Sequence, residues 1–276
     1  MLGCDFSSAP SRRKQIMLAW GQCDGKRLRL SQLQSITSLP DFLTALQATP
    51  NWVGGFDLPF GLPRALVQAL DWPLDWQACI GHYTSLSRAD IRAQFAAFCD
   101  ARPVGGKFAH RATDIPAGSS PSMKWVNPPV AYMLHAGVPL IQAAGAHFPG
   151  LQAPQLQAPR VALEAYPGML AREILGARSY KSDDRAKQTP ERLIARKDLV
   201  NALELGQSRW QSCWQMRLQL SHAQRDALVA DASGDALDAV LCLVQAAWAQ
   251  HHHAAGDPRY GLPTDTDPLE GWIVGA

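Results

Sequence analysis

The sequence predicts an α/β fold in which a mixed sheet is flanked by helices. With 276 residues, 47% of them hydrophobic and 18% charged, the chain is long enough to bury a substantial core. Its first part carries three short strand patterns separated by turn signals, and a helical pattern then precedes a fourth strand pattern. A helix between two strands of one sheet acts as a crossover, so the fourth strand should be parallel to a neighbour.

The first three strands are expected, in order, at residues 1–8, 15–20 and 27–30. Asp24-Gly25 is a strong hairpin signal, and Arg27-Leu-Arg-Leu30 alternates polar and apolar residues as a strand does. Ser38 suits a helix start, Pro50 ends that helix, and residues 52–57 form the next apolar run. The predicted order is therefore β-β-β-α-β.

The pattern loosens between residues 64 and 160. Helical spacing recurs in three stretches, at residues 64–70, 87–99 and 130–136. The remainder is rich in proline and glycine, and such a long irregular stretch in a compact domain is usually a binding loop or a lid. We predict that residues 64–160 are an insertion into a single domain of residues 1–276, and that they partly cover its active face.

The last part of the chain returns to clear patterns. Residues 161–166 resume strand character, and Thr189-Pro190 and Gly206 are the start and stop signals of a helix. Ser221 begins a capping box for a further helix. Residues 235–250 are apolar almost all round, which predicts a helix buried against the sheet.

Composition disfavours several classes of protein. The six cysteines follow no metal-ligand spacing, so we expect reduced thiols and no zinc site. No apolar run reaches the roughly 18 residues of a membrane span, and early charges at Asp5 and Arg12-Arg-Lys14 predict no signal peptide. We therefore expect a cytoplasmic protein with no membrane partner. The net charge of +2 neither demands nor excludes nucleic acid.

Acidic residues stand at the ends of predicted strands and at the start of the last helix. Asp5 and Asp57 each end a short apolar run, and Asp235 and Asp238 share a face of one helical turn. Glu164 lies within an apolar strand, where a buried carboxylate is costly without a partner or a metal. Each aspartate taken alone also has an ordinary structural explanation, either the start of a turn or a favourable interaction with the helix dipole. As a set, the acids predict a site for Mg²⁺ or Mn²⁺.

Five motifs follow one another along nearly the whole chain: Gly3-Cys-Asp-Phe-Ser7, Phe56-Asp-Leu-Pro-Phe-Gly-Leu-Pro63, Glu164-Ala-Tyr-Pro-Gly168, Asp235-Ala-Leu-Asp-Ala239 and Glu270-Gly-Trp-Ile273. They resemble the motifs of domain-of-unknown-function family 429, whose members are described as predicted nucleases. The resemblance implies a ribonuclease H-like fold with a mixed five-stranded sheet. At fold level the chain is also similar to the Holliday-junction resolvases, although these have Glu at the position of Asp57 and lack a counterpart of Glu164.

These observations predict metal-dependent phosphodiester hydrolysis. The resemblance implies that Asp5, Asp57, Asp235 and Asp238 belong to the catalytic set, and we add Glu164 to this set as a further ligand or base. Of these, Asp5, Asp57, Glu164 and Asp238 are the expected ligands of Mg²⁺ or Mn²⁺. The alternatives are a non-catalytic nucleic-acid-binding or scaffold module and a nucleotide-binding phosphotransferase. Phosphotransferases built on this type of sheet need two such domains, and the chain has room for only one. The oligomeric state is left open.

Two segments offer residues for the phosphates of a nucleic acid or a small phosphoester. The insertion carries Lys107, Arg111 and Lys124. Residues 178–197 hold seven lysines and arginines against three acids, and here the candidates are Tyr180, Lys181 and Arg192. The alternative for both segments is an ordinary solvated surface.

Overall fold

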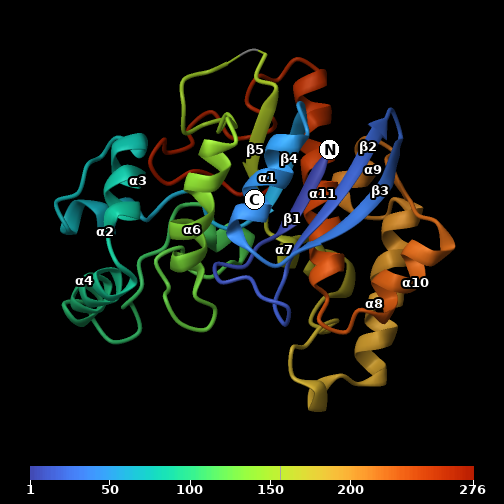
Figure 1. Ribbon diagram of the computed structural model, residues 1–276, viewed down its shortest axis with the longest axis horizontal. Coiled ribbons are helices and arrows are strands. Elements are labelled where there is room, and N and C mark those ends of the chain that lie inside the picture. The colour runs from blue at the N-terminus through green and yellow to red at the C-terminus, as the bar shows by residue number, and fades with distance from the viewer. Residues whose placement is uncertain (156) are drawn as a thin grey trace.

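The computed structural model describes residues 1–155 and 157–276, and within them helices flank one six-stranded mixed sheet (Figure 1). From edge to edge the strand order is β5-β4-β1-β2-β3-β6. Strands β1, β4 and β5 are parallel, whereas β2 is antiparallel to both β1 and β3. The strands are Leu2–Asp5 (β1), Ile16–Asp24 (β2), Arg27–Ile36 (β3), Trp52–Asp57 (β4), Arg160–Glu164 (β5) and Arg217–Gln219 (β6).

The predicted mixed sheet is confirmed, but it has six strands and not five. The additional strand, β6, contains only three residues, too few for an alternating pattern to be recognised in the sequence. It joins the edge of the sheet by pairing in parallel with β3, from Arg27 to Arg29. The other five strands follow one another in the predicted order.

Helix α1 (Leu39–Ala48) forms the predicted crossover between β3 and β4. Its N-cap is Ser38, whose Oγ accepts a hydrogen bond from the backbone N–H of Asp41 at 3.2 Å. The crossover returns the chain to the far side of β1, where β4 pairs in parallel with it. The carboxyl ends of β1 and β4 therefore meet at one edge of the sheet.

Helix α11 (Asp235–Ala254) lies against β1, β2 and β4, and Figure 1 shows it in red behind these strands. Every residue from 236 to 247 is buried, as the nearly all-apolar sequence predicts. Two facing glycines, Gly3 on β1 and Gly55 on β4, allow the helix backbone to approach the sheet. A Cβ at position 3 would lie 2.0 Å from the carbonyl oxygen of Ala239.

The insertion is more regular than the sequence predicts. It contains α2 (Arg64–Ala69), α3 (Trp76–Ser85), α4 (Arg88–Asp100), α5 (Asp114–Ala117) and α6 (Val130–Ala143). Helices α3 and α5 are missing from the sequence prediction, and α6 is longer than expected. The buried apolar residues of α2, α3, α4 and α6 share one hydrophobic cluster with Leu2, Cys4 and Phe56, on the sheet face opposite α11. The insertion is thus part of the hydrophobic core of the domain, and its covering of the active face stays a prediction.

The remaining helices are α7 (Pro167–Leu175), α8 (Pro190–Leu205), α9 (Arg209–Ser212) and α10 (His222–Ala230), and a short 3₁₀ turn is η1 (Arg185–Lys187). Of these helices, α7 and α9 contact α11, and α8 packs against α7 and α10. The capping box of α10 forms at Ser221, and Gly206 ends α8 at a φ of 72°. Among the described residues, no helix combines the length and apolar character that a membrane span requires.

Candidate metal centre

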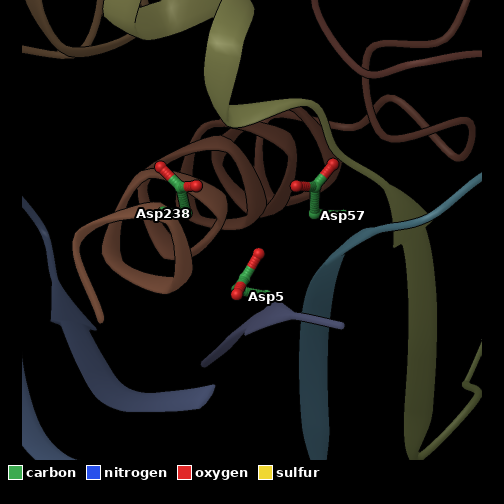
Figure 2. A group of neighbouring side chains, drawn as sticks. All are labelled: Asp5, Asp57 and Asp238. Atoms are coloured by element: carbon green, nitrogen blue, oxygen red, sulfur yellow. The ribbon is translucent and has the colours of Figure 1, made fainter. Parts of the chain in front are cut away.

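Three of the predicted acids meet at the carboxyl edge of the sheet. Asp5 ends β1, Asp57 ends β4, and Asp238 lies in the first turn of α11. Each offers a carboxylate oxygen, and these oxygens lie within 4.8 Å of one another. Figure 2 shows the three side chains converging in the space between the two strand ends and the helix.

Strand alternation explains why these side chains converge. Successive side chains of a strand point to opposite faces, so Asp5 shares a face with Gly3, and Asp57 shares one with Gly55. Asp5 and Asp57 are also direct partners in the parallel register of β1 and β4. The glycines let α11 lie close to this face, which brings Asp238 to the two strand ends.

The carboxylates of Asp5 and Asp57 differ from that of Asp238 in their hydrogen bonding to the described residues. No described residue donates a hydrogen bond to either carboxylate, although Asp5 is only 8% exposed. Burial, and then the negative charge of Asp238, raises the pKa of Asp5 well above its usual range. The same two causes raise the pKa of Asp57 to about 7. Two buried carboxylates this close together, with no hydrogen bond from a described residue, destabilise the fold unless a cation binds between them.

Asp238 has direct hydrogen-bond partners among the described residues, unlike Asp5 and Asp57. The Tyr180 hydroxyl and the Lys181 ammonium each donate to one of its carboxylate oxygens. Burial raises the pKa of Asp238, and Lys181 partly opposes that rise. Tyr180 and Lys181, predicted as phosphate contacts, therefore lie at the acid cluster itself. Asp235 lies beside the trio and accepts a hydrogen bond of 2.8 Å from the ammonium group of Lys14. Lys14 was not among the site residues predicted from the sequence.

Glu164 lies outside the trio, where Arg111 supplies the partner that its buried charge requires. The guanidinium donates to both oxygens of Glu164, at 2.6 and 2.8 Å, and also to Asp114 and to the carbonyl oxygen of Glu270. Burial lowers the pKa of Arg111, but the two carboxylates raise it by more. All the N–H donors of Arg111 are engaged, which leaves none for a substrate phosphate. The role of Glu164 as a metal ligand stays a prediction.

The other predicted phosphate contacts interact with groups outside the acid trio. Lys107 is half-exposed, with its ammonium 3.8 Å from a carboxylate oxygen of Asp100. Arg192 donates to the backbone carbonyl of Lys181 at 2.9 Å and so supports the segment that carries this lysine. Lys124 precedes α6, and its backbone carbonyl accepts a hydrogen bond from the N–H of Ala131. Their direct contact with substrate stays a prediction.

Glu270, part of a sequence motif but not a predicted site residue, ties the C-terminal segment to the insertion. Its carboxylate accepts hydrogen bonds from the backbone N–H groups of Arg64, at 2.7 Å, and Ala112, at 2.9 Å. Its own carbonyl oxygen accepts from Arg111. Through Glu270, the motif at residues 270–273 thus contacts the buried Arg111 and the backbone beside it.

We expect the metal-free protein to lose stability as the pH rises from about 4 to about 7. The pKa of Asp57 rises from 3.8 to about 7 on folding, so the folded state binds more protons than the unfolded state between these values. The free energy of unfolding must then fall as the pH rises, and Asp5 acts in the same direction. Urea unfolding at a series of pH values, with a chelator present, measures the decline. Asp57→Asn should flatten it, and an increase in stability over this range would contradict the buried cluster.

Comparison of the chain with protein-family models, with curated proteins and with solved structures yields no match in any of the three. The resemblance to family 429 therefore depends on the five sequence motifs, and membership in it stays a prediction. Of those motifs, the first four each contribute an acid to the carboxyl edge of the sheet or to the adjoining ion pair.

Proposed function

We propose that this protein is a metal-dependent phosphodiesterase, most simply a nuclease, built on a ribonuclease H-like core. The observation that carries the proposal is the meeting of Asp5, Asp57 and Asp238 within 4.8 Å. Asp5 gives independent support, because it is buried without a donor from any described residue. The mixed sheet, its antiparallel β2 and the acid at the start of the last helix support the core assignment.

The donor set fits a hard divalent cation. Carboxylate oxygens are the ligands that Mg²⁺ and Mn²⁺ prefer, and a site of few carboxylates leaves room for the waters that Mg²⁺ retains. The trio itself consists of carboxylates alone, so it suits Mg²⁺ or Mn²⁺ better than zinc, which favours nitrogen and sulfur ligands.

Each residue of the cluster has a distinct task in this proposal. Asp5 and Asp57 hold the cation, since strand pairing fixes their spacing, and Asp238 completes the site from the helix. A bound divalent cation would supply an activated water and would neutralise charge developing on the phosphate. Tyr180 orients Asp238 by its hydrogen bond. Lys181 contacts Asp238 and also lines the adjoining pocket, where its positive charge faces the place of a phosphate.

Thermal unfolding with and without metal tests the proposal. Mg²⁺ or Mn²⁺ should raise the Tm of the wild type by roughly 5 °C at a hundredfold excess over the Kd, because that excess adds about 2.7 kcal/mol. Asp5→Asn should lose this rise. It should also be at least as stable as the wild type without metal, because it removes one member of a repelling set. Asp226→Asn, a change at an exposed acid of α10, is the matched control and should retain the rise.

Hydrolysis is measured on the same proteins with single-stranded and duplex DNA and RNA and with a small phosphodiester. We expect cleavage of at least one substrate that requires the metal and disappears in Asp5→Asn. A metal-induced rise in Tm without cleavage of any phosphodiester would contradict the nuclease and favour the binding module. A rise of equal size in Asp5→Asn would contradict the metal centre itself.

A further inference from the structure

Two hollows of different character meet at the acid trio. A small pocket of about 230 Å³ lies on the Asp57 side, and Lys181 stands at its wall. A larger and more open groove, of about 850 Å³, lies on the Asp5 side. Pro128 and Met133 line both hollows, so the two are neighbours under the same segment of the insertion.

The small pocket has the lining of a site for one flat, partly polar ring. Its apolar and aromatic lining residues include Leu58, Pro59, Val130 and Tyr166, and its polar ones include Ser120 and the charged residues Asp57, Arg111, Glu164 and Lys181. Its volume lies below the roughly 300–1,000 Å³ typical of pockets for drug-sized ligands. Aromatic and apolar walls with a few hydrogen-bonding groups are what a nucleobase outside a duplex requires.

The open groove has the lining of a path for a phosphate backbone. Arg13 and Arg185 line it and are exposed, and neither forms an ion pair with a described residue. Lys14 also lines it, but its ammonium lies 2.8 Å from an Asp235 oxygen and 3.6 Å from an Asp183 oxygen. The two free guanidinium groups are therefore the strongest candidates for backbone phosphates.

From this arrangement we propose that the site selects single-stranded nucleic acid. One nucleobase occupies the small pocket, the chain continues along the groove past Arg13 and Arg185, and the phosphodiester between them lies at Asp5, Asp57 and Asp238. A paired and stacked base cannot enter a pocket of this size, so duplex is disfavoured unless a base is flipped out. This inference rests on the proposed function for the position of the phosphodiester.

The test measures binding and not turnover. Fluorescence anisotropy follows a labelled strand of about ten nucleotides, as DNA and as RNA, with Ca²⁺ in place of Mg²⁺. We expect either single strand to bind at least tenfold more tightly than the duplex of the same sequence. Arg13→Gln with Arg185→Gln should reduce the slope of log K against log salt by about 1.4, since each phosphate contact on a single strand contributes about 0.7. Arg12→Gln, the exposed neighbour outside the groove, should leave the slope unchanged.

A second pair of variants tests the small pocket. Ser120→Trp fills it and should weaken binding on the order of tenfold, the effect of losing one stacked base. Val104→Trp places the same side chain on the 94%-exposed Val104 of the insertion and should have no effect. If thermal unfolding shows that Ser120→Trp does not fold, Tyr166→Leu tests the pocket by removing its aromatic wall, with the same expected loss.

Two results would overturn the inference: equal affinity for single strand and duplex, or binding that neither the arginine pair nor the pocket variants weaken. Metal-dependent cleavage accompanied by either result would leave the proposed function standing and remove only the strand selectivity. Selective binding of single strands without any cleavage would support the proposed binding of single-stranded nucleic acid in the two hollows, and it would contradict the proposed hydrolase activity.

Discussion

Gly3→Ala is expected to lower the free energy of unfolding by at least about 3 kcal/mol, at the upper end of the cost of overpacking a core. The added Cβ would lie 2.0 Å from the carbonyl oxygen of Ala239 and 2.3 Å from the backbone nitrogen of Leu243. Both atoms belong to the backbone of α11, so no side-chain rotation relieves the overlap. The helix must move away from the sheet.

This movement should also disturb the acid trio. Asp238 precedes Ala239 on α11, so a helix displaced at this point carries Asp238 away from Asp5 and Asp57. We therefore expect Gly3→Ala to lose the metal-induced rise in Tm together with its stability. Urea unfolding and metal titration of the same protein measure the two effects.

Gly81→Ala is the matched control for the same chemical change. Gly81 is an exposed residue of α3, and a Cβ there would meet nothing within 4 Å. Alanine is the better helix former, so this variant should gain up to about 1 kcal/mol. A Gly3→Ala protein as stable as the wild type, with its metal response intact, would show that α11 does not lie against β1 at this point.

Arg111→Met is expected to lower the free energy of unfolding by about 3–5 kcal/mol. Arg111 is 2% exposed, and the substitution leaves the carboxylates of Asp114 and Glu164 buried without their cation. The loss should be greater at pH 8 than at pH 5. Burial already raises the pKa of Glu164 above its usual value, and Arg111 opposes that rise, so without the arginine this pKa lies higher still and stability is lost as the pH rises towards it.

Two comparisons separate this effect from the loss of packing. Adding Glu164→Gln to Arg111→Met removes one unpaired charge and should recover part of the stability. Arg64→Met breaks the ion pair with Asp267, in which both partners are partly exposed, and should cost only about 0.2–1 kcal/mol. Equal losses for Arg64→Met and Arg111→Met would contradict the buried network, and urea unfolding distinguishes these outcomes.

Much of the scaffold was readable in the sequence. The hairpin at Asp24-Gly25, the start of α1 at Ser38 and the capping box at Ser221 all form where local chemistry predicts them. Helix α3 was missed, although its buried residues, among them Trp76, Ile80 and Tyr83, follow helical spacing. The prolines and glycines around it suggested an irregular loop, but tertiary packing of the aromatic side chains favours the helix.

The sequence by itself determined which acids are available and the strands that carry them, because strand alternation and turn signals act over a few neighbouring residues. Only the tertiary structure decided their partners. Strand register placed Asp5 beside Asp57, and the close approach of α11 over Gly3 and Gly55 added Asp238. Glu164 was instead directed to Arg111, more than fifty residues away. Such pairings depend on register, on the face of the sheet and on burial, which are properties of the folded chain and not of any short segment.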